Sequence, residues 1–168
     1  MLITTILDIH NGEHAMTQGK RHNPYYQAQA ILSRRDHSVY ELRLKLTRHG
    51  FSAEQVDTTV EQLKKEHLVN DSRFAAAFVE STLRRKAVGP RWLRAKLKQQ
   101  GIEQSIIDHI FAGHFGNGQE EELLRQAAVQ WRGRHQEFQH DHIRLTRFLV
   151  ARGFSPGAIT AYLEQLSP

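Results

Sequence analysis

Residues 42–56 read LRLKLTRHGFSAEQV, and the same pattern returns as LRAKLKQQGIEQSII at 93–107 and as LTRFLVARGFSPGAI at 145–159. In each copy a leucine stands eight and four residues before a glycine, a large apolar residue follows that glycine, and an isoleucine or valine stands six residues after it. Leucines four residues apart share one face of a helix, and a glycine directly after them suits the left-handed conformation that ends a helix. The glycines are spaced by 51 and then 52 residues, which predicts one small helical unit used three times.

Capping signals predict three helices in each unit. Ser38, with Glu41 three residues later, has the pattern of a capping box before the first leucine pair, and Ser52 can cap the helix after Gly50. In the second unit residues 70–72 offer three capping side chains, and Pro90 stands where a first helical turn tolerates proline. We therefore expect an all-α protein of three tandem three-helix repeats, helix-turn-helix-like, which stack into an elongated body.

The expected boundaries follow from composition and period. Residues 1–25 are predicted to be a disordered tail, followed by repeats at 26–68, 69–116 and 117–168, and Met16 is an alternative to Met1 as the true start. The apolar opening MLITTILDI lacks a basic leader, a cleavage site and the length to span a bilayer. GHFGNG at 113–118 is expected to be a flexible hinge, and the loop at 132–140 is longer than its counterparts.

The overall charge favours an acidic partner. A net charge of +5 and a pI near 9.7 are typical of proteins that bind nucleic acid, an anionic membrane surface or an acidic protein. The chain has no cysteine, which excludes a disulfide framework and a thiolate metal site and fits a reducing cytoplasm. We expect a cytoplasmic protein.

The sequence favours no catalytic or metal centre. His135, His140 and His142 stand in the long loop without the ligand spacing of a zinc site, and Asp141 beside His142 has no accompanying nucleophile. The glycine cluster at 113–118 lacks the lysine and hydroxyl of a phosphate loop. We expect neither enzymatic activity nor a cofactor nor a bound metal.

The strongest electrostatic feature lies between Ser81 and Ile102, where seven basic residues and no acidic residue occur. These candidate binding residues are Arg84, Arg85, Lys86, Arg91, Arg94, Lys96 and Lys98, and the first unit adds Arg34, Arg35 and Arg43. Arg91, Arg94 and Lys98 are predicted to form one exposed stripe, because residues at i, i+3 and i+7 share a helix face. Such a stripe can follow a phosphate backbone or an acidic groove, or it can be a solvated face that keeps the protein soluble.

Three stretches resemble a known family. RRDHSVYELRLKL at 34–46, NDSRFAAAFV at 70–79 and VGPRWLRAKLKQQGI at 88–102 are similar to signature stretches of RecX, the bacterial regulators of the RecA recombinase, and the resemblance runs from about residue 26 to 166. It implies a curved all-α protein of three three-helix repeats that lodges in the groove of the RecA filament on single-stranded DNA. Members of the family restrain filament extension, strand exchange, ATP turnover and co-protease function in DNA repair and the SOS response, without a catalytic centre of their own.

The favoured hypothesis is therefore a monomeric regulator that binds the RecA filament, with no membrane partner. Single-stranded DNA is an expected partner, double-stranded DNA a further candidate, and both capping of filament ends and coating of grooves stay open. One alternative is an independent helix-turn-helix-like DNA-binding module, whose affinity for single strands falls with salt. Another is a helical adaptor for an acidic protein, which would show no affinity for DNA.

Overall fold

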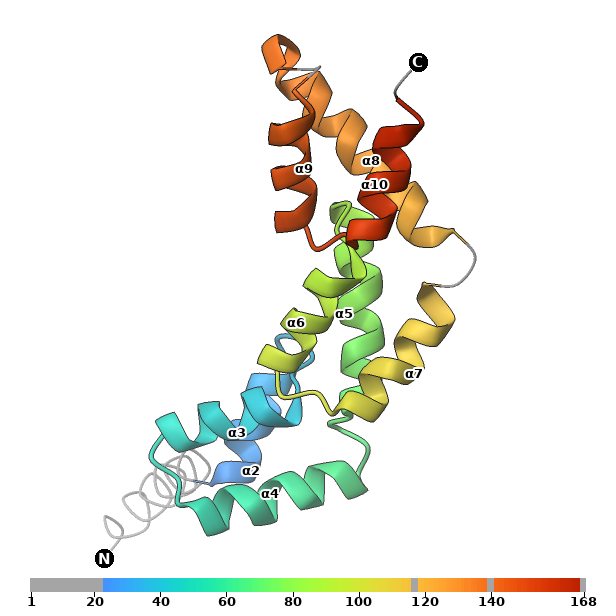
Figure 1. Ribbon diagram of the computed structural model, residues 1–168. Helices are drawn as coiled ribbons and strands as arrows, with labels where there is room; N and C mark the ends of the chain where they lie inside the picture. Colours follow the sequence, from blue (N-terminus) through green and yellow to red (C-terminus); the bar gives the residue numbers. More distant parts are fainter. Residues whose placement is uncertain (1–22, 116–117, 139–140, 167–168) are drawn as a thin grey trace, which may run out of the picture. The chain divides into compact units, whose positions relative to one another are not determined.

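The computed structural model describes residues 23–115, 118–138 and 141–166, and all nine α-helices in this part of the chain are shown in Figure 1. The predicted tail lies outside the described residues up to residue 22, but its last residues do not: Asn23 caps a helix that begins at Pro24. The chain divides into two compact units, Met1–Asn70 and Asp71–Pro168. Within the described ranges no helix is long and apolar enough to cross a membrane.

The first unit is a single three-helix repeat. Helices α2 (Pro24–Leu32), α3 (Val39–Arg48) and α4 (Ala53–Lys65) each pack against the other two. Ser38 caps α3 by accepting a hydrogen bond from the Glu41 amide, and Ser52 forms a complete capping box with Gln55 at the start of α4. The helices enclose one apolar core, made of Ala28, Ile31, Leu42, Leu46, Phe51, Val56, Val60, Leu63 and Val69.

The second unit contains two three-helix repeats. Helices α5 (Asp71–Arg85), α6 (Pro90–Gln99) and α7 (Gln104–His114) surround one core, and α8 (Gln119–Arg134), α9 (His142–Ala151) and α10 (Pro156–Glu164) surround another. A short 3-10 helix, η1 (Gln136–Phe138), lies between α8 and α9. Different helices thus form the two cores of this unit, but Leu83 and Phe115 pack against both cores.

The glycine pattern is confirmed in every repeat. Gly50, Gly101 and Gly153 have φ angles of +88°, +73° and +80°, the left-handed conformation expected directly after a helix. All six leucines of the pattern have no exposed surface: Leu42, Leu46, Leu93, Leu97, Leu145 and Leu149. The fold is therefore all-α, with three tandem three-helix repeats.

Two expected loops are more helical than the sequence suggested. Gly113 and His114 belong to α7, so these two residues of the predicted hinge at 113–118 are helical; Gly118 has a φ of +83° before α8, and residues 116–117 lie outside the described residues. Three glutamates in the first turn of α8 favour a helix that begins directly after Gly118. In the loop predicted at 132–140, α8 continues to Arg134 and η1 follows, while His140 lies outside the described residues.

The second and third repeats join through backbone contact at two glycines. The Gly89 amide donates to the Arg152 carbonyl at 2.9 Å, and the Arg91 amide donates to the Gly153 carbonyl at 3.1 Å. A Cβ atom placed on Gly89 would lie only 2.5 Å from the Phe154 nitrogen, so a side chain has no room. Gly89 is the N-cap of α6, and the equivalent N-cap of α3 is Ser38. The close approach of the third repeat explains why the N-cap of α6 is a glycine and not a serine.

Candidate basic binding surface

The seven cations of residues 81–102 lie on two helices and the loop between them. Arg84 and Arg85 end α5, Lys86 is in the loop, and the others belong to α6. Arg84, Arg85, Lys86, Arg91 and Lys98 are exposed, whereas Arg94 and Lys96 are half-buried. All seven side chains therefore reach solvent to some extent, but their local partners differ.

The positive charge of Arg94 is neutralised by a carboxylate on the neighbouring helix, α7. Its guanidinium donates to the Asp108 carboxylate of α7 at 2.5 Å and also lies 4.3 Å from the centre of the Phe111 ring. Hydrogen bonds from Gln104 and Arg94 lower the pKa of Asp108, which stays ionised at neutral pH. The counter-charge that is missing from residues 81–102 is thus supplied from α7. In the described part of the predicted stripe only Arg91 and Lys98, at its two ends, form no ion pair, and the charge of Lys98 also helps to lower the pKa of Asp108.

The first unit contains an equivalent pair. Arg43 of α3 forms an ion pair with Asp57 of α4, and these positions lie 51 residues before Arg94 and Asp108. The third repeat has Thr146 and Thr160 at the corresponding positions, 52 residues further on. The pair therefore joins the second and third helices of the first two repeats. An arginine followed 14 residues later by an aspartate in both repeats was the sequence signal for it, and our reading of the sequence missed it.

Two of the lysines form cation–π contacts with Trp92. The ammonium groups of Lys86 and Lys96 lie 4.8 and 5.6 Å from the centre of its ring, and the ring packs against the core of the second repeat. Lys96 also donates to the Gln99 side chain at 3.1 Å. These contacts position both charges beside a partly buried aromatic ring. Trp92 thus has a packing role.

The remaining cations of the middle repeat face different surroundings. In the described part of the chain Arg84, Arg91 and Lys98 form no ion pair, and the Arg85 guanidinium donates to the Ser81 carbonyl at 3.0 Å. Arg84 lines a groove together with Glu80 and residues 114, 119, 123 and 126, whereas Arg91 lines a second groove along α6 and α7. The structure therefore brings Arg91, Arg94 and Lys98 together along α6 and directs Arg84 elsewhere.

Of the three cations predicted to bind in the first unit, two are paired with carboxylates and one is not. Arg35 donates two hydrogen bonds to the Glu41 carboxylate at 2.9 and 3.1 Å, which lowers the pKa of Glu41 against the opposing effect of burial. Arg43 is paired with Asp57. Arg34 is exposed in the loop after α2 and forms no such pair within the described ranges.

The residues that suggested metal or acid–base chemistry have structural contacts. His135 stacks on Trp131 at 5.0 Å and its Nδ1 lies 2.9 Å from the Trp131 carbonyl, while Asp141 caps α9 and pairs with Arg144. The described residues contain no group of histidine, aspartate or glutamate side chains arranged to hold a metal ion.

Repeated three-helix domains define a helical-repeat protein, and its middle repeat is basic. Sequence models of the RecX family match the chain twice, as the first three-helix domain at residues 25–63 and the second at residues 70–109. Regulatory protein RecX of Chlorobium phaeobacteroides is 33% identical over 136 residues, which cover 81% of this chain and 88% of that protein. The chain belongs to the RecX family.

A second relative supports this assignment, and two crystal structures share the fold. Regulatory protein RecX of Prosthecochloris aestuarii is 31% identical and covers 83% of this chain and 91% of its own length. A crystal structure of regulatory protein RecX has a TM-score of 0.76 at 22% identity, with 87% of this chain and 74% of that chain covered. The crystal structure of RecX from Lactobacillus salivarius has a TM-score of 0.75 at 18% identity, with 89% of this chain and 97% of that chain covered. Both show the same fold.

Proposed function

We propose that this protein regulates the RecA recombinase by binding its filament on single-stranded DNA and restraining its ATPase, strand-exchange and co-protease activities. The observation that carries the proposal is the match of the first two repeats to the RecX domains, together with relatives named regulatory proteins over most of the chain. The protein acts as a monomer in the cytoplasm and performs no catalysis itself. It changes RecA only by binding one state of the filament more tightly than another.

The proposed contact surface is centred on α6. Arg91 and Lys98 are exposed seven residues apart on one helix, and neither is paired with a carboxylate in the described ranges. An unpaired cation gives up only its water when it binds an anionic groove, whereas Arg94 would also have to leave Asp108. The filament offers such a groove, since it holds a polyanionic DNA strand. The other cations of the middle repeat extend this surface, and Arg34, Arg35 and Arg43 are proposed as a further contact within the first unit.

The test of the function is ATP turnover by RecA on single-stranded DNA, measured as this protein is added at amounts well below one copy per RecA. Suppression at these ratios is the expected result, because a regulator that blocks filament growth acts on many protomers at once. Unchanged turnover would overturn the proposal. If direct binding to single-stranded DNA that weakens with salt accompanied it, the protein would be an independent DNA-binding module.

Charge reversal on α6 should separate binding from folding. The double variant Arg91→Glu and Lys98→Glu should inhibit RecA about tenfold less potently, the equivalent of about 1.4 kcal/mol. Its circular dichroism and urea midpoint should match those of the unchanged protein, because exposed charges contribute little to stability. Arg94 is left in place, since reversing it would set a glutamate beside Asp108 and disturb the fold.

The matched control is Arg134→Glu with Arg147→Glu. Both arginines are exposed in the third repeat, so the net charge changes equally. Equal loss of inhibition in the two double variants would mean that total charge, and not the surface of α6, governs binding.

A further inference from the structure

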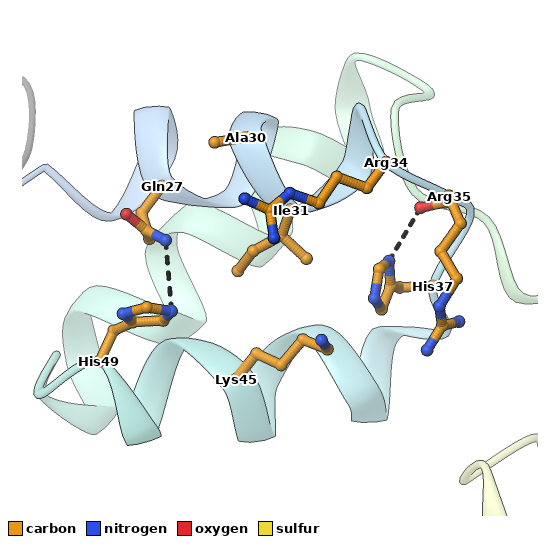
Figure 2. A pocket seen from close by; sticks show the side chains of 8 residues that line it. All are labelled: Gln27, Ala30, Ile31, Arg34, Arg35, His37, Lys45 and His49. Atoms are coloured by element: carbon orange, nitrogen blue, oxygen red, sulfur yellow. Dashed lines mark hydrogen bonds between the residues drawn. The ribbon is translucent and has the colours of Figure 1, made fainter.

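A basic pocket opens between α2 and α3 in the first unit (Figure 2). It is lined by Gln27, Ala30, Ile31, Arg34, Arg35, His37, Lys45 and His49, which include three cations, two histidines and no carboxylate. The first unit therefore concentrates positive charge around a concave site made from α2, α3 and the loop between them.

His37 is the buried polar group of this pocket. Its side chain is only 4% exposed, and its Nδ1 lies 2.9 Å from the Arg35 carbonyl. A carbonyl oxygen only accepts hydrogen bonds, so Nδ1 carries a proton. The second ring nitrogen, Nε2, is buried and has no hydrogen-bond partner in the protein. A buried nitrogen left in this way costs free energy that a ligand with matching chemistry can recover.

The fold itself does not need histidine at this position. The second repeat has Val88 at the corresponding place, 51 residues further on, and Val88 is 1% exposed in its core. The same offset pairs the buried Ala28 with the buried Val79, so the comparison is between equivalent positions. A valine would lack the hydrogen bond from Nδ1 to the Arg35 carbonyl, but it would also bring no unpaired buried nitrogen, and the unpaired Nε2 therefore points to a role in binding.

Two unpaired cations face the same space. Figure 2 shows Lys45 on α3 and Arg34 in the loop after α2, with the Arg34 side chain extending over Ile31, and both residues line the pocket. Neither forms an ion pair in the described part of the chain, whereas Arg35 is engaged by Glu41 and by the Asp36 carbonyl. His49 completes the rim, where the Gln27 amide approaches its Nε2 at 3.2 Å.

We propose that this pocket binds one phosphate group. The phosphate oxygens accept hydrogen bonds from the Arg34 guanidinium, the Lys45 ammonium and a protonated Nε2 of His37. A single proton from solvent moves to Nε2 as the anion enters the pocket. Phosphate suits the site because a tetrahedral dianion accepts several charge-assisted hydrogen bonds from different directions. The proposal does not depend on the function proposed above, since RecA takes no part in it.

Anion binding is coupled to protonation of His37. Burial lowers the pKa of His37, the nearby charges of Arg35 and Lys45 lower it further, and the hydrogen bond to the Arg35 carbonyl and the charge of Glu41 act in the opposite direction. With the pocket empty the ring is therefore neutral at pH 7, and a bound dianion favours the charged ring. Uptake of one proton makes the affinity increase as the pH falls, by at most about tenfold for each pH unit.

The experiment is a titration of the whole protein with sulfate, a tetrahedral dianion that does not titrate near neutral pH. The ring nitrogens of His37 are followed by nuclear magnetic resonance at pH 7.5 and at pH 6.5. We expect Nε2 to change from an unprotonated to a protonated nitrogen on saturation, with tighter binding at the lower pH. No change at His37 up to about 50 mM sulfate, which would nearly saturate a millimolar site, would overturn the proposal.

Two variants and one matched control test the assignment. His37→Val introduces the residue of the equivalent position and should abolish the pH dependence, while Lys45→Gln, at a partly exposed site, should weaken sulfate binding about tenfold. Lys96→Gln changes the equivalent lysine of the second repeat, which lies beside Trp92, and should leave sulfate binding unchanged. Binding that survives both first-repeat variants would place the anion elsewhere and refute the site.

A competition experiment identifies the source of the phosphate. Inorganic phosphate and a thymidine oligonucleotide are each titrated into the sulfate-loaded protein. Displacement of sulfate from His37 by the oligonucleotide, lost in Lys45→Gln, would identify a nucleic-acid phosphate as the ligand. Displacement by inorganic phosphate alone would identify a free phosphate. Failure of both to displace sulfate would contradict a phosphate site.

Discussion

Replacing Gly153 with alanine should lower the free energy of unfolding of the second unit by about 4 kcal/mol, because three penalties combine at this residue. Its φ of +80° is unfavourable for a residue with a Cβ atom. The new Cβ atom would lie 2.5 Å from the Trp92 Cβ and 2.8 Å from the Trp92 Cα, where the chain cannot yield without moving α6. Such a movement would also break the hydrogen bond from the Arg91 amide to the Gly153 carbonyl.

Urea unfolding followed by tryptophan fluorescence measures this effect, because Trp92 and Trp131 are the only tryptophans of the chain and both belong to the second unit. The matched control is Gly50→Ala in the first unit, followed by circular dichroism. Gly50 has a similar φ of +88°, but a Cβ atom there would meet no other atom within 4 Å. Its expected cost is that of the left-handed conformation alone, about 1–2 kcal/mol. Equal costs at Gly50 and Gly153 would mean that the contact between repeats adds nothing.

Leu97→Ala is the second substitution with a large expected effect. Leu97 has no exposed surface in the core of the second repeat, where it packs with Leu93 of the same helix. Removing a fully buried leucine loses transfer free energy and leaves a cavity, so the second unit should be destabilised by about 2–5 kcal/mol. The same fluorescence experiment in urea measures the loss.

The control for Leu97→Ala lies in the third repeat. Val150 follows the leucine pair of α9 and is 54% exposed, so Val150→Ala should change the stability by less than about 0.5 kcal/mol. A Leu97 variant as stable as the Val150 variant would contradict both the buried position of Leu97 and the alignment of the repeats.

The repeats were predictable because the rules that produce them act over short distances. A pair of leucines four residues apart and a glycine that ends the helix operate within a dozen residues, and all three copies have the expected burial and φ angles. The caps at Ser38 and Ser52 and the first-turn position of Pro90 depend on neighbours within one helical turn and were also predicted. Family membership followed from the same stretches.

The basic surface was only partly predictable, because a cation can be neutralised by a carboxylate that is distant in the sequence but close in the folded protein. Residues 81–102 contain no acid, yet Asp108 reaches Arg94 from the next helix. Whether two such residues pair depends on the packing of α6 against α7, which periodicity does not specify. The prediction that Arg91, Arg94 and Lys98 bind the filament stays a proposal, and the structure selects Arg91 and Lys98 for the first experiment.

By itself, the sequence determined the helices, the three repeats, the buried leucine stripes and the family, because hydrophobic period, capping and helix termination depend on residues within a few turns. Only the tertiary structure decided that Gly89 and Gly153 meet, that Arg94 and Arg43 are paired, and that His37 presents an unpaired nitrogen beside Arg34 and Lys45. The physical reason is that these contacts join different helices, so they arise only when the apolar faces pack and bring side chains remote in sequence together.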